Sequence, residues 1–117
     1  MTDHEGLLPL PPHTFHILLA LRGRALHGYG IKKEVQSRTQ GRIDLDAGGL
    51  YRLIARMESR GVVRVASPPA DGPEDERRRV FYTLTAGGEA LLAAEARRLA
   101  SLVNSPDVTA LLKGAGA

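Results

Sequence analysis

The chain has 117 residues, a length that suits one domain, because a small globular chain can bury one hydrophobic core but rarely two. It contains no cysteine, which excludes disulfide bonds and removes thiolates from the possible metal ligands and nucleophiles. Hydrophobic residues make up 43% of the sequence and aromatic residues 4%, so aliphatic side chains must form the core and a rigid aromatic ligand pocket is not expected.

The apolar segments are short. The longest early run, Ile17 to Leu21, falls far below the roughly 20 residues that span a bilayer. No basic stretch of the kind that opens a signal peptide precedes it. We therefore expect a soluble, cytoplasmic protein without a membrane partner.

Positive charge is concentrated in the middle of the chain. The net charge is +3, but residues 22–64 contain ten lysines or arginines and four acids, a local excess of six. Such a patch favours polyanions, because neutralised phosphates release condensed counterions. A solvated basic face without a partner explains the charge equally well, so charge alone does not choose between the two.

The first helix signal follows two prolines. Residues 1–12 have no sustained hydrophobic period, which predicts a flexible N-terminal arm. From Phe15 onward, apolar residues recur at the three- and four-residue spacing of one helix face, until Gly23 interrupts them. This pattern predicts a helix over about His13–Arg22.

A second short helix is predicted over Gly28–Arg38, where Ile31 and Val35 lie four residues apart on one face. Gln40-Gly41 interrupts it. The alternation in Ile43-Asp44-Leu45 then favours a very short strand.

The segment Asp46–Arg60 predicts a third helix with two distinct faces. Asp46 suits its N-cap, because the carboxylate can accept from the free amides of the first turn and complements the helix dipole. One face is an apolar stripe of Leu50, Leu53, Ile54 and Met57. The opposite face is basic, small and flat, with Tyr51 on its flank; it holds Gly48, Arg52, Ala55, Arg56 and Ser59.

A β-hairpin is predicted after this helix. Gly61 is placed to end the helix, and the β-branched run Val62–Val65 is typical of a strand. Arg79–Leu84 has the same character, and the intervening Ser67–Glu76 is rich in proline. A hairpin that follows a helix pair is the wing of a winged helix.

A long amphipathic helix is predicted over Ala86–Val103, with Thr85 as its N-cap. Ser105-Pro106 begins a last short helical turn, and Lys113–Ala117 forms a tail of small residues. The apolar side of the long helix is wide, and we expect it to form a dimer interface through Leu91, Leu92, Ala96, Leu99, Leu102 and Val103. The alternative is that this helix folds back on its own domain.

The predicted fold class is mainly α with a small β-hairpin, a winged helix-turn-helix followed by a long C-terminal dimerisation helix. Residues 1–12 are the arm, residues 13–85 the winged helix-turn-helix domain, and residues 86–113 the long helix with the short terminal helix. This architecture alone does not fix a function.

Four blocks of sequence, in this order, narrow the possibilities: Leu26-His27-Gly28-Tyr29-Gly30-Ile31, then Gly48-Gly49-Leu50-Tyr51-Arg52-Leu53-Ile54-Ala55-Arg56-Met57-Glu58, then Gly61-Val62-Val63, and then Arg78-Arg79-Val80-Phe81-Tyr82-Thr83-Leu84-Thr85-Ala86-Gly87. Together, over about Phe15–Leu102, the chain resembles the PadR family of bacterial transcriptional regulators. The resemblance implies a winged helix that binds operator DNA, a C-terminal helix that makes a homodimer, and usually repression. In many members a small molecule, commonly a phenolic acid or a drug-like compound, releases the DNA, so an effector is a possible partner here.

Two departures from the family pattern matter. Gly49 stands where members commonly carry Thr or Ser, which removes a hydroxyl from the start of the third helix but leaves the backbone amides for a phosphate. The C-terminal region is short and the chain has no tryptophan, so the tryptophan-sandwiched drug pocket of some relatives is not transferred.

Arg52 and Arg56 are the preferred candidates for DNA contact, because arginine can bond guanine O6 and N7 in a bidentate manner. The alternative is a solvated arginine or one paired with Glu58 or another acid. Tyr51 either donates its hydroxyl to a phosphate or covers the side of the core, and Gly28 is either a phosphate contact or a simple helix-entry residue. The complete expected set is Gly28, Tyr29, Lys32, Lys33, Gly48, Gly49, Tyr51, Arg52, Arg56, Arg77, Arg78 and Arg79.

The wing leaves an alternative open. Its arginines are placed on the return strand, where they can reach the adjacent minor groove or its phosphates. The acids Glu74-Asp75-Glu76 precede them, so an internally compensated surface hairpin is the other explanation.

No catalytic, metal or cofactor site is indicated. His13 and His16 lie near one helix face but lack a third ligand at helical spacing, and no phosphate loop or Ser-His-Asp set is present. The leading hypothesis is a sequence-specific DNA-binding regulator, a homodimeric repressor of a pseudo-palindromic operator. The alternative is a winged-helix protein interaction module without specific DNA binding.

Overall fold

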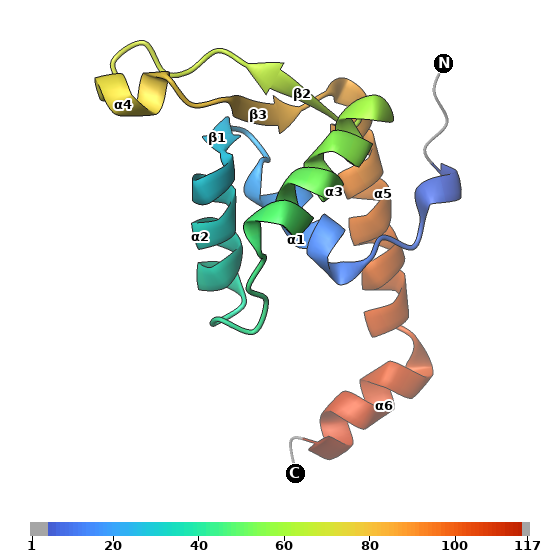
Figure 1. Ribbon diagram of the computed structural model, residues 1–117. Helices are drawn as coiled ribbons and strands as arrows, with labels where there is room; N and C mark the ends of the chain where they lie inside the picture. The colour runs from blue at the N-terminus through green and yellow to red at the C-terminus, as the bar shows by residue number, and fades with distance from the viewer. Residues whose placement is uncertain (1–4, 116–117) are drawn as a thin grey trace.

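The computed structural model describes residues 5–115 and confirms the mainly α fold with a small sheet. A 3-10 turn over Glu5–Leu7 precedes the first helix. The helices are α1 (Pro12–Ala20), α2 (Gly28–Arg38), α3 (Ala47–Ser59), α4 (Glu74–Arg77), α5 (Ala86–Val103) and α6 (Pro106–Ala115), and the strands are β1 (Leu26–His27), β2 (Val63–Ala66) and β3 (Phe81–Leu84). Figure 1 shows α1, α2 and α3 gathered beside the upper part of α5, with the sheet across one end.

The predicted hairpin is confirmed. β2 and β3 pair antiparallel, with Val63 opposite Leu84 and Ala66 opposite Phe81. The sheet has a third strand, β1, which pairs with the other side of β3 and gives the order β1-β3-β2. Because β1 leads directly into α2, the sheet ties the wing to the helix-turn-helix.

The short strand predicted at Ile43–Leu45 is wrong. That segment is irregular, and the backbone N–H of Ile43 donates to Thr39 Oγ1 at 3.1 Å. A strand needs a partner, and residues 43–45 pair with none of the three strands of the sheet. Residues 43–45 therefore close the connection between α2 and α3, and Leu45 is buried there.

The core lies between α1, α2, α3 and α5, around fully buried Ile17, Leu18 and Ile31. The apolar stripe predicted for α3 faces this core, because Leu50, Ile54 and Met57 are buried and Leu53 is partly buried. The start of α3 is also as predicted, because the Asp46 carboxylate accepts from the Gly49 N–H at 2.7 Å. Because the apolar face of α3 is turned to the core, its opposite face is turned to solvent.

The part of the expected N-terminal arm that the structure describes lies against the body of the protein. Leu10 is 9% exposed, and its N–H donates to Glu95 Oε2 on α5 at 3.0 Å. Glu95 is 1% exposed and is also bound by Arg98. A buried carboxylate needs such donors, and the backbone of the arm supplies one. Residues 1–4 lie outside the described residues.

The wing loop contains a helical turn that the sequence did not predict. Glu74–Arg77 form α4, in which the Arg77 N–H donates to the Pro73 carbonyl at 3.0 Å. Arg77 therefore lies in α4, and Arg78 and Arg79 lie in the turn after it. Their predicted place on the return strand is wrong, because β3 begins at Phe81.

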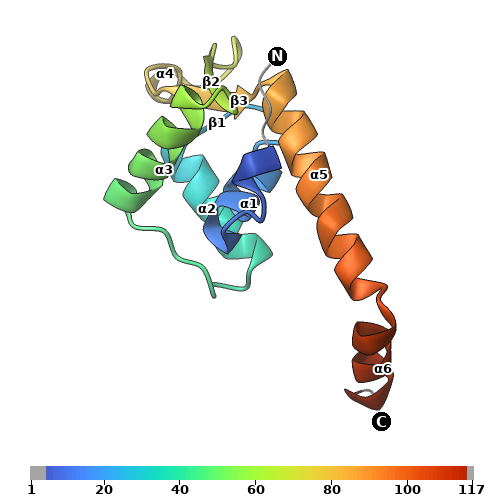
Figure 2. The same cartoon turned by 90° about the vertical axis from the view of Figure 1, so that its right-hand side faces the viewer.

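The C-terminal part extends away from the domain. α5 spans the predicted residues, but Leu91 and Leu92 are 3% and 6% exposed and belong to the chain's own core. Of the other residues expected at a dimer interface, Leu99 is partly exposed, and Ala96, Leu102 and Val103 are exposed. The expected last turn is a ten-residue helix, α6. Figure 2 shows α6 beyond the body of the winged helix.

Candidate nucleic-acid interface

The outward face of α3 matches the face that its sequence predicts. Gly48, Arg52, Ala55, Arg56 and Ser59 are exposed, and Tyr51 is 49% exposed. Neither Arg52 nor Arg56 makes an ion pair within residues 5–115. The helix therefore presents two arginines and a phenol to solvent, on a backbone with little side-chain bulk between them.

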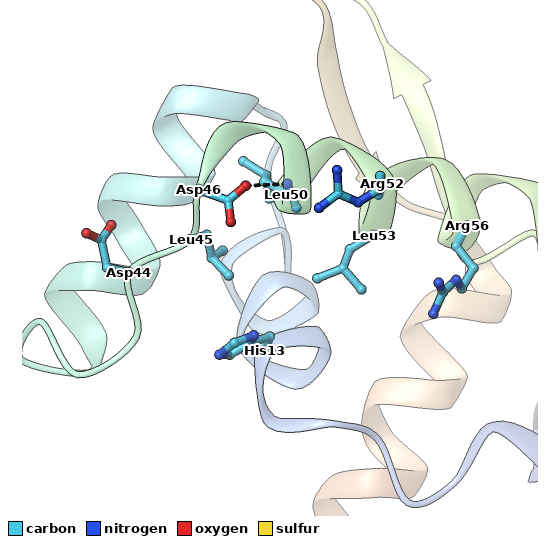
Figure 3. Close-up of a pocket in the computed structure, with 9 residues that line it drawn as sticks. His13, Asp44, Leu45, Asp46, Leu50, Arg52, Leu53 and Arg56 are labelled. Atoms are coloured by element: carbon cyan, nitrogen blue, oxygen red, sulfur yellow. Dashed lines mark hydrogen bonds between the residues drawn. The ribbon is translucent and has the colours of Figure 1, made fainter.

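One side of α3 borders a cavity of about 270 Å³, which we call the arginine cavity. Figure 3 shows Arg52 and Arg56 projecting from α3 on this side, with Leu53 between them and His13 on the start of α1, across from the helix. Two carboxylates stand at the N-terminal end of α3, where the dashed line in Figure 3 marks the cap bond of Asp46. The lining residues are His13, Asp44, Leu45, Asp46, Gly49, Leu50, Arg52, Leu53 and Arg56.

The other side of α3 borders a second cavity, of about 380 Å³, between α2, α3 and the wing. All three tyrosines of the protein line it, one from α2, one from α3 and one from β3. We call it the tyrosine cavity; it is lined by His27, Gly28, Tyr29, Tyr51, Arg78, Arg79, Val80 and Tyr82, none of them acidic. Its hydroxyls and guanidinium groups can donate hydrogen bonds to an anion.

Tyr82 is a member of this cavity that the sequence reasoning missed. Burial raises the pKa of the Tyr82 hydroxyl, and the nearby Tyr51 hydroxyl and Glu58 carboxylate raise it further. The Tyr82 hydroxyl therefore stays protonated and able to donate a hydrogen bond. The sequence carried only part of a signal, because neighbouring side chains in a strand point to opposite faces, but burial along β3 does not alternate: Phe81 and Leu84 are both buried.

The basic residues of the middle of the chain fall into two groups. Arg24 and Arg38 both bind Glu34, at 3.0 and 2.9 Å, and their guanidinium groups hold the pKa of that carboxyl below its usual value. Lys32 Nζ lies 3.5 Å from Asp44. Lys33 differs from these residues, because its Nζ lies over an aromatic ring, 5.4 Å from the centroid of Tyr29.

The transcriptional regulator PadR-like family model matches residues 17–94, which include the helix-turn-helix, the wing and the first half of α5. The chain belongs to the PadR family.

Solved structures share this PadR-family fold. A transcriptional regulator from Clostridium thermocellum is 23% identical with a TM-score of 0.63, over 77% of this chain and 82% of that one. A PadR family transcription regulator from Clostridium difficile R20291 is 25% identical with a TM-score of 0.61, over 79% and 94%. Bacillus subtilis PadR, solved in complex with operator DNA, is 22% identical with a TM-score of 0.59, over 74% of this chain and 47% of that one. A search of curated protein sequences gave no significant match.

The PadR-family chain presents most of the expected contact residues to solvent, with three exceptions. Gly28 is buried, Lys32 is partly buried against Asp44, and the Gly49 N–H is taken by the Asp46 cap. The Gly49 amide is therefore not available to a phosphate, whereas phosphate binding by the other amides at the start of α3 stays a prediction. The exposed members are Tyr29, Lys33, Gly48, Tyr51, Arg52, Arg56, Arg77, Arg78 and Arg79.

Other kinds of site find little support in the part of the chain that the structure describes. No group of three or more His, Cys, Asp or Glu residues there is arranged to hold a metal ion. His16 is partly buried beside the Phe15 ring, and His13 is exposed at the arginine cavity. No helix among residues 5–115 is long and apolar enough to cross a membrane.

Proposed function

We propose that this PadR-family regulator binds operator DNA as a homodimer, through the outer face of α3, and represses transcription. One observation carries the proposal: Arg52, Arg56 and Tyr51 stand exposed on α3, beside the tyrosine cavity, whose wall supplies further hydroxyl and guanidinium donors. The wing does not cover the two arginines, since no wing residue lines the arginine cavity.

An α-helix fits the major groove of B-DNA, and the small residues Gly48 and Ala55 allow α3 to approach the base edges closely. In that position Arg52 and Arg56 bond guanine O6 and N7. The tyrosine cavity lies beside the helix and would take the flanking sugar-phosphate backbone. Contacts with bases then give sequence preference, and contacts with phosphates fix the orientation.

The homodimer part of the proposal rests on apolar surface at the end of the chain. Leu102 and Val103 at the end of α5 are 51% and 50% exposed, and Leu111 and Leu112 on α6 are 70% and 59% exposed. Four large apolar side chains gathered on one projecting arm are typical of an interaction surface. A second copy that covers this arm by a two-fold axis would place two α3 helices for a pseudo-palindromic operator.

Release of the DNA by a small molecule is a further part of the proposal. An apolar cavity of about 180 Å³ lies between the N-terminal segment, α3 and α5, where Leu10, Leu53 and Leu91 line it. Arg56 borders both this cavity and the arginine cavity. A small apolar carboxylate bound there would attract the Arg56 guanidinium and compete with DNA for it. Titration of benzoate against the DNA complex checks this, and an unchanged DNA affinity at saturating benzoate counts against this ligand class.

Selection of bound sites from random DNA tests the proposal as a whole. We expect a pseudo-palindromic consensus, and at least tenfold tighter binding to it than to a scrambled duplex at about 0.15 M salt. A reporter placed behind the selected site should be repressed when the protein is expressed. Equal affinity for both duplexes refutes sequence-specific binding, and no binding at low salt instead favours the protein interaction module.

A further inference from the structure

A turn of the wing straddles the start of α2. Glu76 Oε1 lies 3.8 Å from His27 Nε2, and the Arg79 guanidinium carbon lies 5.9 Å from the centroid of the Tyr29 ring. The two wing residues are joined by a backbone bond from the Arg79 N–H to the Glu76 carbonyl at 3.0 Å. The rings of His27 and Tyr29 are stacked with their centroids 6.5 Å apart. These four residues form a closed set of contacts between the wing and α2.

His27 is fixed by its other neighbours. Its Nδ1 accepts from the Gly30 N–H at 3.0 Å and caps α2, and its ring meets the edge of Phe81 with centroids 5.2 Å apart. An imidazole nitrogen that accepts a hydrogen bond carries no proton, so the proton of the neutral ring is on Nε2, the atom that faces Glu76. The His27 side chain is 12% exposed and that of Glu76 is 50% exposed. His27 is therefore the fixed partner, and the wing residue docks onto it.

The acids of the wing do not all compensate its arginines. Glu74 binds Arg78, with its Oε1 3.1 Å from Arg78 Nη2. Glu76 is turned to His27 instead, which leaves Arg79 to approach the Tyr29 ring from the wing. At an exposed site, the attraction between a cation and an aromatic ring is weak. Arg79 therefore remains able to bind an anion that attracts its guanidinium group more strongly than the ring does.

We propose that His27 is a positioning residue for the wing. Its contact with Glu76 docks residues 74–79 against α2 and so holds Arg79 at the tyrosine cavity, where it binds a phosphate of the DNA backbone. The role of Arg79 rests on the proposed function, whereas the docking of the wing does not, and the two parts are tested separately.

Hydrogen exchange of the full chain without DNA tests the docking. Glu76→Ala should speed exchange of the Arg77 and Arg79 amides, because the α4 turn loses its anchor. Asp75→Ala is the matched control, since it removes the same charge from the same turn away from His27. His27→Asn should act like Glu76→Ala, because asparagine still caps a helix but does not reach Glu76. Exchange in Glu76→Ala equal to that in Asp75→Ala overturns the docking.

DNA affinity tests the role of Arg79. Removing an acid near DNA raises affinity by charge alone, and this is the result expected for Asp75→Ala. Glu76→Ala should instead lower affinity about threefold, the scale of one exposed charge contact. In an Arg79→Ala background the loss of affinity caused by Glu76→Ala should vanish, so that Glu76→Ala and Asp75→Ala have the same effect on DNA affinity. A loss that persists without Arg79, or equal gains from both variants, overturns the positioning role. If no variant binds DNA while the exchange result holds, the proposed function and the role of Arg79 fall and the docking stands.

Discussion

The phenol of Tyr51 on α3 lies directly over Gly28, the first residue of α2. A Cβ placed on Gly28 would collide with the Tyr51 hydroxyl and the ring carbon that bears it. Gly28 is buried, while Tyr51 remains half exposed. The missing side chain at Gly28 therefore sets where the Tyr51 hydroxyl stands in the tyrosine cavity.

Gly28→Ala should weaken DNA binding more than it weakens the fold. Tyr51 is a surface side chain and can swing outward, so the free energy of unfolding should change by less than about 1 kcal/mol. DNA binding should lose about 1 kcal/mol, the net worth of one hydrogen bond. Competition binding and thermal unfolding measure the two quantities.

Tyr51→Ala is the control that identifies the cause. In that background the collision is absent, so Gly28→Ala should have no further effect on DNA affinity. An additional loss of the same size would mean that Gly28 acts on DNA by a route other than Tyr51.

Gly88→Ala should have the opposite pattern. A Cβ on Gly88 would collide with the backbone carbonyl of Val62, where α5 starts beside β2. A backbone atom in a packed contact cannot swing away, and overpacking of this kind costs about 1–3 kcal/mol. Urea unfolding measures it, and Gly114→Ala, where the space is open, is the control. Equal stability of the two variants would contradict the close approach.

Arg52 should affect discrimination more than general affinity. Arg52→Lys keeps the charge but loses the planar fork that bonds guanine, so binding to scrambled DNA should persist while preference for the selected site falls by about 1–3 kcal/mol. Arg52→Ala should lose both. The ratio of the two dissociation constants is the measurement, and an unchanged ratio in both variants removes Arg52 from the base-contacting set.

The sequence predicted the elements whose signal is local. The Asp46 cap, the α3 stripe and the Thr85 start of α5 depend on residues within a few positions of one another, and the structure has all three. β1 is two residues long and is a strand only because β3 lies beside it, so no periodicity could show it. The same limit hid the tyrosine cavity, whose residues come from separate elements.

The residues expected at a dimer interface show most clearly what the sequence alone could not predict. The spacing of α5 marks an apolar face, but it does not say whether this chain or a second copy covers that face. Leu91 and Leu92 are covered by the chain's own core, and Leu102 and Val103 are not. Only the packed structure divides the helix into a core half and an exposed half.

Glu95 should make the stability of the protein sensitive to acid. The hydrogen bonds from Arg98 lower its pKa below the usual 4.5, with help from the Leu10 N–H, although burial opposes them. A carboxyl whose pKa is depressed on folding contributes stability above its unfolded pKa, and that stability is lost as the pH falls through the folded pKa. The loss should therefore begin near pH 4.5 and continue below it.

Glu95→Gln keeps an oxygen for the Leu10 N–H but removes the charge that Arg98 binds. It should cost about 2 kcal/mol at neutral pH, the scale of hydrogen bonds to a charged group, and should flatten the dependence of stability on pH below 4.5. Urea unfolding across this range measures both effects. Glu89→Gln, on an exposed position of the same helix, is the control. A variant with the slope of the parent protein would show that Glu95 does not carry the acid sensitivity.

The proposed dimer should depend on α6 and the end of α5. Leu111→Asp combined with Leu112→Asp places two charges on apolar side chains that lie outside the chain's own core, so each chain should still fold. Burying those charges at an interface is costly, and the sedimenting species should change from a dimer to a monomer at micromolar concentration. Lys113→Asp introduces the same residue at an exposed position of α6 and should leave the dimer intact. DNA affinity should fall with the dimer, because one half-site then binds alone. A double variant that remains dimeric would move the interface away from α6, and a monomeric parent protein would remove the dimer from the proposal.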